Sequence, residues 1–489
     1  MNLILILIFG FVLRLVNLNQ SLWLDETVQA ITSKGSFLGL FTELRGDFHP
    51  PLYHLLMWLW AHLFGNGEIA MRLPSVFFGT ATIYVVYLIA KKLFSKKSKF
   101  PLIAALFLAT APFHIYYSQE ARTYAMTVFL AALSTYWFIK MIDNSGKRQR
   151  SSLFYLLATV LLLYADYYGL FVFLAQIVAA LIILRRKFIQ KLKTFLFIFL
   201  FFLPCLPLLW IQLKTGSQAT AFLPQWGRLV NLNFLKALPL TFIKFSIGRI
   251  TIFNKKIYAF VAALLFLAYG LIFLNSFFKN KQVCFWRNKK FRIKSPLLII
   301  LFWLLVPVLL AWLISFFIPN YQPFRLLLVL PAFYLLLVYG ISRFSLQRMK
   351  MILTIGVIVV NLVSVGVYYF NPYFHREDWR GVVHYIEENG NENSLALLPS
   401  QTSHWPYAYY SQDKVSLVAV ARDVRAINNR DLQNLSTDKI KTFYYIYYLT
   451  DLFDPQGMIV NWLENQKFVK IEEISFNQIK IQEWSYVHE

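Results

Sequence analysis

Two adjacent carboxylates, Asp25 and Glu26, stand in the stretch L-W-L-D-E, just after the first apolar segment of the chain. Carboxylates are scarce here: residues 1–370 contain eight, and five of them fall within residues 19–68. Neighbouring carboxylates repel each other and tend to raise each other's pKa. A carboxylate with a raised pKa is suited to general base catalysis, which makes Asp25 a candidate base. The alternative is structural, because early acids suit a helix dipole and Ser21 can cap that helix.

A second polar stretch, D-F-H-P-P-L-Y-H, runs from Asp47 to His54. Tandem prolines fix an extended entry to a helix. Residues 52–64 are apolar and aromatic but too short to span a bilayer, so we expect a helix lying along the membrane interface. His49 then lies at the mouth of that helix, near the acids, with Asp47 and His54 as further candidate binding residues. The alternative is that His49 only forms the turn.

A third polar stretch, Y-Y-S-Q-E-A-R-T-Y, connects two apolar segments and ends at Tyr124. Arg122 can make forked hydrogen bonds to phosphate oxygens, and Tyr124 fits an interfacial aromatic belt. Glu120 and Arg122 can instead simply pair with each other. Arg325 opens a later apolar segment at the outer face, where it either snorkels to the interface or contacts a ligand. For Arg14, inside the first segment, we expect snorkelling to the outer interface rather than ligand contact.

The elements that must position these residues are membrane helices. The chain has 489 residues, of which 58% are apolar and 15% charged, whereas soluble domains average about 45–50% and about 25%. A spanning helix needs roughly 20 apolar residues. We therefore predict a polytopic α-helical membrane protein with about eleven spans: 2–18, 69–90, 101–117, 123–139, 152–165, 167–184, 194–212, 257–278, 296–317, 324–341 and 351–370. The first segment lacks a small-residue cleavage site, which indicates a retained helix.

Lys and Arg cluster in alternate loops, and short basic loops stay in the cytoplasm. The net charge of +24 is thus mostly a topology signal, and we expect no nucleic-acid partner. This orientation places the amino terminus in the cytoplasm and residues 371–489 outside the cytoplasmic (inner) membrane. All the carboxylates of residues 1–370 except Asp143 then face outward.

Two further regions lie on the predicted outer side. Residues 213–256 are basic and form either an interfacial helix or an extra span; Lys236 and Lys244 favour the first, because they would be costly at the bilayer centre. Residues 371–489 read as a small α/β domain, with helices at 377–388 and 458–465 and strands at 395–398, 415–420, 443–448 and 468–474. The two cysteines, Cys205 and Cys284, offer no disulfide framework.

These motifs together resemble the integral-membrane glycosyltransferases of the protein O-mannosyltransferase type. The resemblance rests on L-x-x-D-E, H-P-P-L, R-L-P-S from Arg72, S-Q-E-A-R-x-Y and the later H-R-E-D-W-R from His375. It extends to the bacterial branch, glycosyltransferase family 39, and to the aminoarabinose transferases, and it covers nearly the whole chain. The resemblance implies a GT-C fold: residues 1–370 form the membrane domain, with the site in the first outer loop, 19–68, and residues 371–489 form an extracytoplasmic domain.

The resemblance also implies a reaction, in which a hexose or pentose passes from a polyprenyl-phosphate donor to a protein, lipid or glycan acceptor, with inversion. Asp25 would be the base, and Glu26 would support or orient it. His49 and Arg122 would contact the donor phosphate. Arg325 fits a phosphate- or sugar-binding position, although the aromatic that usually follows it is Leu326 here. Glu120, Tyr124, Asp47 and His54 complete the expected substrate-binding set.

Several alternatives stay open at this stage. One is a structural or assembly subunit that presents its outer α/β tail. Another is an oligosaccharyltransferase-like enzyme, which the absence of a W-W-D-type motif in that tail disfavours. A flippase or transporter of lipid-linked sugar would carry ionisable residues at mid-membrane depth and inverted repeats, and the sequence shows neither beyond Arg14. Adjacent Asp and Glu can also bind a divalent cation. No wider ligand set is evident, so we expect no obligatory metal or other cofactor.

Overall fold

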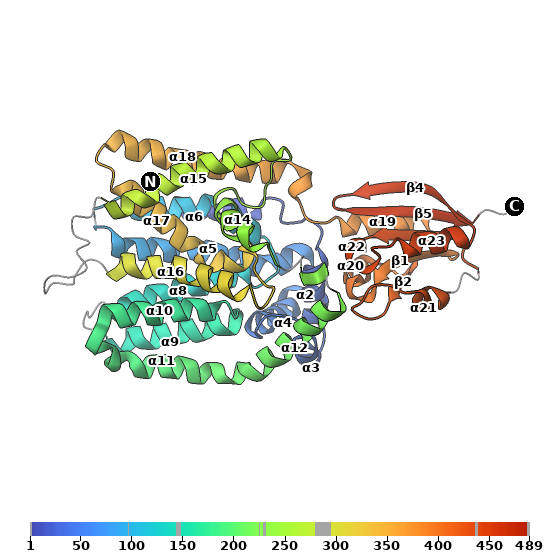
Figure 1. Cartoon of the computed structure of the whole chain (residues 1–489), viewed down its shortest axis with the longest axis horizontal. Coiled ribbons are helices and arrows are strands. Elements are labelled where there is room, and N and C mark those ends of the chain that lie inside the picture. Colours follow the sequence, from blue (N-terminus) through green and yellow to red (C-terminus); the bar gives the residue numbers. More distant parts are fainter. Residues whose placement is uncertain are drawn as a thin grey trace.

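The computed structural model describes residues 2–486 except 96, 143–147, 224, 228–230, 279–294 and 436–438. Asp143, Cys284 and part of the basic clusters used to predict orientation lie outside the described residues. The helical part lies at one end of the molecule and the C-terminal domain at the other (Figure 1). The amino terminus lies toward the end of the helical part that faces away from the C-terminal domain (Figure 1).

The helical part is built from apolar helices that mostly run side by side (Figure 1). Its elements are α1 (Leu3–Leu15), α2 (Leu24–Lys34), α3 (Phe37–Glu43), α4 (Leu52–Phe64), α5 (Glu68–Leu93), α6 (Phe100–Thr110), α7 (Pro112–Ser118), α8 (Tyr124–Ile142), α9 (Arg148–Ala165), α10 (Gly169–Leu184), η1 (Arg185–Phe188), α11 (Ile189–Phe202), η2 (Leu203–Cys205), α12 (Leu206–Phe222), α14 (Phe234–Ile247), α15 (Lys255–Phe278), α16 (Ser295–Ile314), η3 (Pro323–Val329), α17 (Leu330–Ser342) and α18 (Gln347–Phe370). Each of the eleven predicted segments is occupied by helix.

Among the described residues, seven helical stretches are long and apolar enough to cross a membrane, or eight if α6 and α7, bent by 58°, form one span. One of the seven, Gly169–Phe222, counts 54 residues as a single run. That run reverses direction, because the rings of Phe173 and Phe195 lie 6.1 Å apart, whereas a straight helix would separate them by about 33 Å. The chain is thus a multi-pass membrane protein, and the count of eleven spans stays a prediction.

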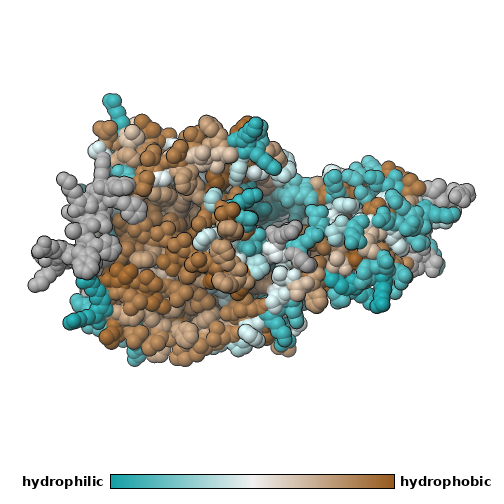
Figure 2. All heavy atoms as spheres, viewed as in Figure 1, coloured by the Kyte–Doolittle hydropathy of each residue, from teal (hydrophilic) through white to brown (hydrophobic). Residues whose placement is uncertain are grey.

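The outer surface of the helical part is apolar, as expected of a surface in contact with lipid. Hydrophobic residues cover it as a broad band, and hydrophilic residues cover the C-terminal domain and gather at the ends of the helices (Figure 2). Many large apolar side chains on it are exposed, including Leu196, Phe199 and Phe266. Such a surface is stable only in lipid, where apolar side chains need no cover.

The basic stretch 213–256 contains the end of α12 and the helix α14. Helix α14 has 14 residues with a proline inside, Pro239, and it is absent from the stretches that qualify as spans. Its buried face packs Thr241 and Phe245 against the bundle. The interfacial position of residues 213–256 stays a prediction.

The C-terminal domain is a five-stranded sheet with helices. Its elements are η4 (Pro372–Phe374), α19 (Trp379–Asn389), β1 (Ser394–Ser400), η5 (Gln401–Ser403), α20 (Trp405–Tyr410), β2 (Ser416–Ala421), α21 (Asn429–Gln433), β3 (Thr442–Tyr447), α22 (Thr450–Phe453), α23 (Met458–Asn465), β4 (Phe468–Phe476) and β5 (Ile479–Tyr486). The strand order is β2-β1-β3-β5-β4, with β1 parallel to β2 and β3, and β5 antiparallel to β3 and β4. The α/β prediction is confirmed, but β5 was not predicted.

The C-terminal domain packs on the helix that carries the acidic pair. Leu24, the residue before Asp25, contacts the apolar cluster of the domain that contains Trp379 and Tyr448. The hydroxyl of Tyr410 accepts a hydrogen bond from the backbone N–H of Leu22 at 2.7 Å. The start of α2 is therefore held from both the membrane part and the C-terminal domain.

Candidate active site

Helix α2 begins directly before the acidic pair, and its cap differs from the predicted one. Trp23 is the N-cap and makes no capping hydrogen bond with its side chain. Ser21, the expected cap, instead bonds the hydroxyl of Tyr410 at 3.3 Å and accepts from the backbone N–H of Arg380 at 3.0 Å. The prediction for Ser21 was wrong because its hydroxyl forms hydrogen bonds with the C-terminal domain instead of capping α2. Asp25 and Glu26 both lie in the first turn of α2.

Asp47 is the centre of a cluster built from the turn before α4. One carboxylate oxygen lies 2.9 Å from Nδ1 of His49, and the other lies 3.0 Å from Nε2 of His54. Arg122 approaches the second oxygen at 3.6 Å. Helix α4 occupies the predicted range, Leu52–Phe64, which brings His54 back over the turn that carries His49. The three residues expected near the helix mouth thus lie together.

Arg122 joins this cluster to Asp25. Its Nη2 lies 3.7 Å from Oδ2 of Asp25 and 3.3 Å from Nδ1 of His49. Because an ionised carboxylate can only accept, the 2.9 Å contact with Asp47 favours a proton on Nδ1 of His49. That nitrogen then accepts no hydrogen bond from Arg122. The Arg122 side chain is 9% exposed, whereas that of Asp25 is 38% exposed. Asp25 is therefore the member of the group that an incoming molecule can reach.

The two aspartates differ in their electrostatic surroundings. Enclosure by the protein raises the pKa of Asp25, and the effect exceeds the opposing influence of Arg122. Burial also raises the pKa of Asp47, but Arg122, His49 and His54 outweigh it and hold that pKa well below its usual range. Paired carboxylates with diverging pKa values are typical of acid–base sites.

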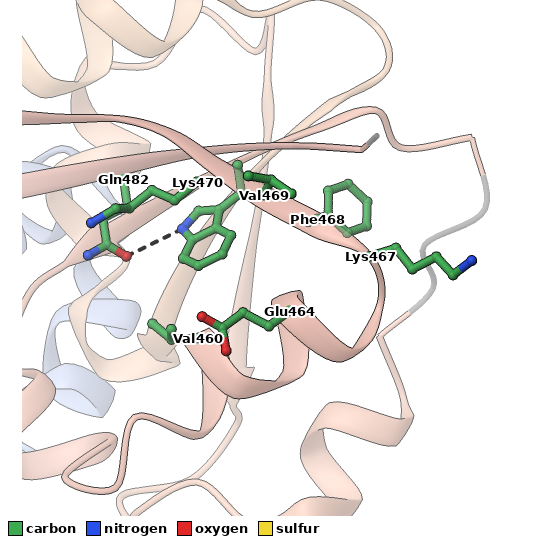
Figure 3. Close-up of a pocket in the computed structure, with 8 residues that line it drawn as sticks. Val460, Glu464, Lys467, Phe468, Val469, Lys470 and Gln482 are labelled. Carbon is green, nitrogen blue, oxygen red and sulfur yellow. Dashed lines mark hydrogen bonds between the residues drawn. The ribbon is translucent and has the colours of Figure 1, made fainter. Parts of the chain in front are cut away.

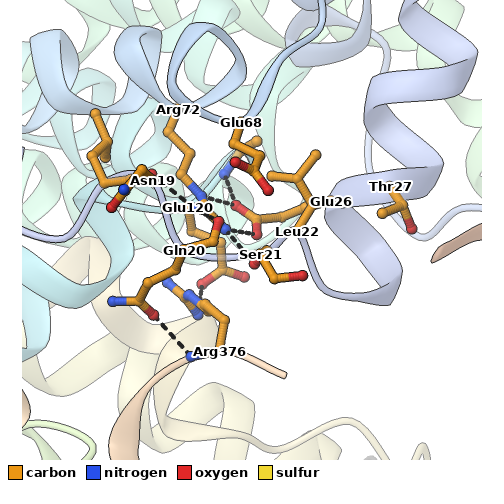
Figure 4. Close-up of polar contacts among 12 residues, drawn as sticks. Asn19, Gln20, Ser21, Leu22, Glu26, Thr27, Glu68, Arg72, Glu120 and Arg376 are labelled. Carbon is orange, nitrogen blue, oxygen red and sulfur yellow. Dashed lines mark hydrogen bonds and ion pairs between the residues drawn. The ribbon is translucent and has the colours of Figure 1, made fainter. Parts of the chain in front are cut away.

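Glu26 points toward Arg72 of α5 (Figure 4). Its carboxylate accepts from Nε and Nη2 of Arg72 at 2.8 and 2.5 Å and from the backbone N–H of Ala121 at 2.7 Å. Both charged side chains are almost completely buried. Among the described residues, no hydrogen bond joins the Glu26 and Asp25 side chains, and the expectation that Glu26 supports or orients Asp25 stays a prediction. Glu26 positions α2 because Arg72 of α5 takes its charge.

Glu120 does not pair with Arg122, which was one of its two expected roles. Its carboxylate binds Nη1 of Arg376, at the start of the C-terminal domain, at 3.1 Å (Figure 4). Both side chains are at most 3% exposed. The sequence contains no signal for this pair, because the two residues are 256 positions apart.

Arg14 was expected to snorkel, and this prediction was wrong. Its guanidinium is fully buried and donates to the carbonyls of Gly10, Leu108 and Ala109 at 2.6 to 3.3 Å. The bend between α6 and α7 frees carbonyls of α6 from their helical partners, which gives the guanidinium its acceptors. Arg14 thus supports the bundle and does not reach a ligand or the interface.

Two further predicted residues border the cluster. The ring of Tyr124 lies 6.1 Å from that of His49 in an edge-to-face arrangement. Arg325, in η3, is partly exposed and stacks on Phe324 at 5.9 Å, which itself packs on Tyr124 at 5.4 Å. Arg325 is close enough to Asp166 to lower its pKa, although burial raises that pKa overall. Asp166 was counted among the outer acids but not among the site residues.

A cavity of about 290 Å³ opens between the membrane part and the C-terminal domain. Trp23, Arg249 and Glu377 line it, together with residues 373–376. Burial raises the pKa of Glu377 to about 6, and the charge of Asp25 contributes to that shift. Arg249 is exposed, donates to the hydroxyl of Tyr116 at 3.0 Å and makes no ion pair with a carboxylate among the described residues. Neither residue was among the predicted site residues: Glu377 lies in the H-R-E-D-W-R motif, which served only for the resemblance, and Arg249 lies in the basic stretch 213–256, which was interpreted only as a helix at the interface or an extra span.

A second, larger hollow of about 460 Å³ lies on the C-terminal domain between α23 and β4 (Figure 3). Its lining includes Glu464, Lys470 and Trp484, and none of the predicted site residues. Elsewhere in the described ranges, no group of three or more His, Cys, Asp or Glu side chains is placed to hold a metal ion. The expectation that the protein needs no obligatory divalent cation stays a prediction.

The comparison with protein families points to one group. Residues 48–211 match the family described as dolichyl-phosphate-mannose-protein mannosyltransferase. This range includes the H-P-P-L and S-Q-E-A-R-x-Y motifs. No curated protein matches the chain.

Solved structures show the same fold over nearly the whole chain. ArnT from Cupriavidus metallidurans bound to undecaprenyl phosphate shares 12% identity at a TM-score of 0.57, covering 99% of this chain and 97% of that one. The oligosaccharyltransferase AglB from Archaeoglobus fulgidus, in complex with an inhibitory peptide and a dolichol-phosphate, shares 12% at 0.54, covering 91% and 69%. The mycobacterial arabinofuranosyltransferase AftD shares 13% at 0.50, covering 99% and 40%. The resemblance drawn from the motifs is confirmed, and the fold is GT-C.

Proposed function

We propose that this protein is a glycosyltransferase that moves a sugar from a polyprenyl-phosphate donor to a hydroxyl-bearing acceptor at the extracytoplasmic face of the membrane, with inversion. The observation that most directly supports this is the pair Asp25 and Asp47, which Arg122 bridges and whose pKa values shift in opposite directions. The lipid phosphates bound by ArnT and AglB support a donor of the same class. No observation favours the flippase alternative.

Asp25 acts as the general base in the proposed reaction. Its carboxylate takes the proton of the acceptor hydroxyl while that oxygen attacks the anomeric carbon. The bond between the anomeric carbon and the phosphate oxygen breaks, and the electron pair leaves with the polyprenyl phosphate. Asp47 stays ionised and holds Arg122 and His49 in place beside the base. The raised pKa of Asp25 strengthens it as a base relative to an ordinary aspartate.

The leaving phosphate needs cations to stabilise its charge. Arg122 and His49 stand at the site, but the two aspartates compensate the charge of Arg122. Arg249 and Arg325 carry guanidinium groups without a carboxylate ion pair among the described residues. We propose Arg249 as the principal phosphate partner, because it lines the cavity beside Asp25, with Arg325 as the second.

The test is a transfer assay with purified protein reconstituted in lipid vesicles. A panel of radiolabelled hexosyl and pentosyl polyprenyl phosphates serves as donors, with membrane glycans, lipids and envelope proteins of the producing cell as acceptors. The proposal predicts that label moves to an acceptor while polyprenyl phosphate is released in equal amount. Movement of intact donor across the vesicle membrane, without cleavage of the sugar–phosphate bond by any donor, would instead identify a flippase.

A further inference from the structure

Arg376 enters the membrane part from the beginning of the C-terminal domain. Besides its ion pair with Glu120, its Nη2 donates to the carbonyl of Tyr116 at 3.1 Å. Its guanidinium lies 3.8 Å from the centre of the Tyr116 ring. Its backbone N–H donates to the side-chain oxygen of Gln20 at 2.9 Å, just before α2 (Figure 4). One residue of the C-terminal domain thus fixes both sides of the candidate site.

The turn that Arg376 holds makes a different contact at each of three consecutive positions. Glu120 binds Arg376, and the backbone N–H of Ala121 binds Glu26. Arg122 reaches Asp25 and Asp47. The three residues share one short backbone segment. A displacement of Glu120 therefore also moves the backbone N–H of Ala121, which binds Glu26, and the side chain of Arg122, which faces Asp25.

Charge makes this turn dependent on Arg376. Burial raises the pKa of Glu120, and Arg376 is the strongest of the charges that lower it again. A buried carboxylate that loses its cation must take up a proton or rearrange. Loss of Arg376 therefore removes the anchor of the Glu120–Arg122 turn, and a rearrangement of the charged Glu120 displaces that turn.

We propose that Arg376 is a positioning residue for the transfer reaction: it anchors the Glu120–Arg122 turn so that Arg122 faces Asp25. This inference rests on the proposed function, in which Asp25 is the base. It makes the C-terminal domain a part of the active site and not only a module that recruits acceptors. The rival interpretation is that Arg376 merely fastens the domain to the membrane part.

Arg380 provides the matched control for that rival interpretation. It lies on α19 and pairs with Glu68 of the membrane part at 2.7 Å, but its side chain is 52% exposed. In the described part of the chain, its side chain touches neither the Glu120–Arg122 turn nor Asp25, and its one ion pair is with Glu68. Arg380→Gln therefore weakens the attachment of the domain without moving Arg122.

The first measurement does not depend on catalysis. A carbodiimide modifies protonated carboxyls, so the pH dependence of Asp25 labelling, read by mass spectrometry, reports its protonation. Arg122 lowers the pKa of Asp25, so Arg376→Gln is expected to move the labelling midpoint of Asp25 to higher pH, and Arg380→Gln is expected to leave it unchanged. An unchanged midpoint in Arg376→Gln, or an equal shift in both variants, overturns the proposal.

The second measurement is the rate of transfer. We expect Arg376→Gln to lower kcat by about 100-fold, as for a displaced catalytic group, with little change in the KM for the donor. The double variant Arg376→Gln/Glu120→Gln has no unpaired buried charge and is expected to recover at least about tenfold over the single variant. A double variant no faster than the single one contradicts the proposal. Absence of transfer by the unaltered protein would count against the proposed function, and the labelling result would still decide the role of Arg376.

Discussion

Glu26 is predicted to matter for stability far more than Asp25, although the two residues are adjacent. Glu26→Gln removes a charge that is completely buried against Arg72, which is itself 1% exposed. Breaking a buried ion pair in this way costs about 3–5 kcal/mol. Arg72 also donates to the carbonyls of Leu18, Gln20 and Ser21 at 2.5 to 3.0 Å. Because these bonds survive, we expect the lower end of the range, about 3 kcal/mol.

Asp25→Asn is the matched change one position earlier. The raised pKa of Asp25 means that its contribution to stability is present below its unfolded pKa, about 3.9, and is lost as the pH rises through its folded pKa. At neutral pH the ionised group therefore destabilises the fold, and the neutral Asn does not. We expect the Asp25→Asn protein to be at least as stable as the unaltered one.

Thermal unfolding in detergent, followed by tryptophan fluorescence, distinguishes the two variants. Glu26→Gln is expected to lower Tm by about 3 °C, because an unfolding entropy of roughly 2.1 cal/mol/K per residue gives about 1 °C per kcal/mol for a chain of 489 residues. Asp25→Asn is expected to leave Tm unchanged or slightly raised. The reasoning fails if Glu26→Gln keeps the unaltered Tm and loses only rate, since that result assigns Glu26 the supporting catalytic role inferred from the family. It also fails if Asp25→Asn destabilises the protein as much.

Three further predictions follow from the geometry of the site. Asp47→Asn removes a negative charge beside Asp25 and frees Arg122, so the acidic limb of the pH–rate profile should move down by about one pH unit; an unmoved limb contradicts the coupling. Arg249→Gln should raise the KM for the polyprenyl-phosphate donor about tenfold, the cost of one hydrogen bond to a charged group, and an unchanged KM in steady-state kinetics refutes its phosphate role. Burial raises the pKa of Glu377 to about 6, so its ionisation should lower the stability of the protein as the pH rises through 6. The Tm of Glu377→Gln should therefore fall less than that of the unaltered protein between pH 5 and pH 8, and equal falls in Tm would show that this carboxyl does not titrate there.

The sequence predicted the local elements well where a single stretch of chain determines them. The range of α4 and that of α23 match, because an apolar or amphipathic run bounded by proline or glycine suffices to define a helix. Four strands of the sheet were also found. The fifth, β5, was missed. It lies between β3 and β4 in the sheet, and its pattern I-K-I-Q-E-W-S-Y keeps a single alternation of apolar and polar residues only over its first half.

The partners of the charged residues were the part that sequence spacing could not provide. Glu26 binds a residue 46 positions away, and Glu120 binds one 256 positions away. Asp47, His49 and His54 were grouped correctly because they lie within eight residues of sequence. Long-range pairs depend on how the helices and the C-terminal domain pack, and composition carries no record of that packing.

The Asp25→Asn protein tests the central claim most directly. In the reconstituted transfer assay, with a saturating donor, we expect its kcat to fall by at least about 100-fold, the usual worth of a general base, while binding of the donor persists. Asp423→Asn is the control, because that carboxylate is 79% exposed on the C-terminal domain, and it should retain full activity. An Asp25→Asn protein that transfers the sugar within a few-fold of the unaltered rate would contradict the account, since no base at Asp25 would then be needed.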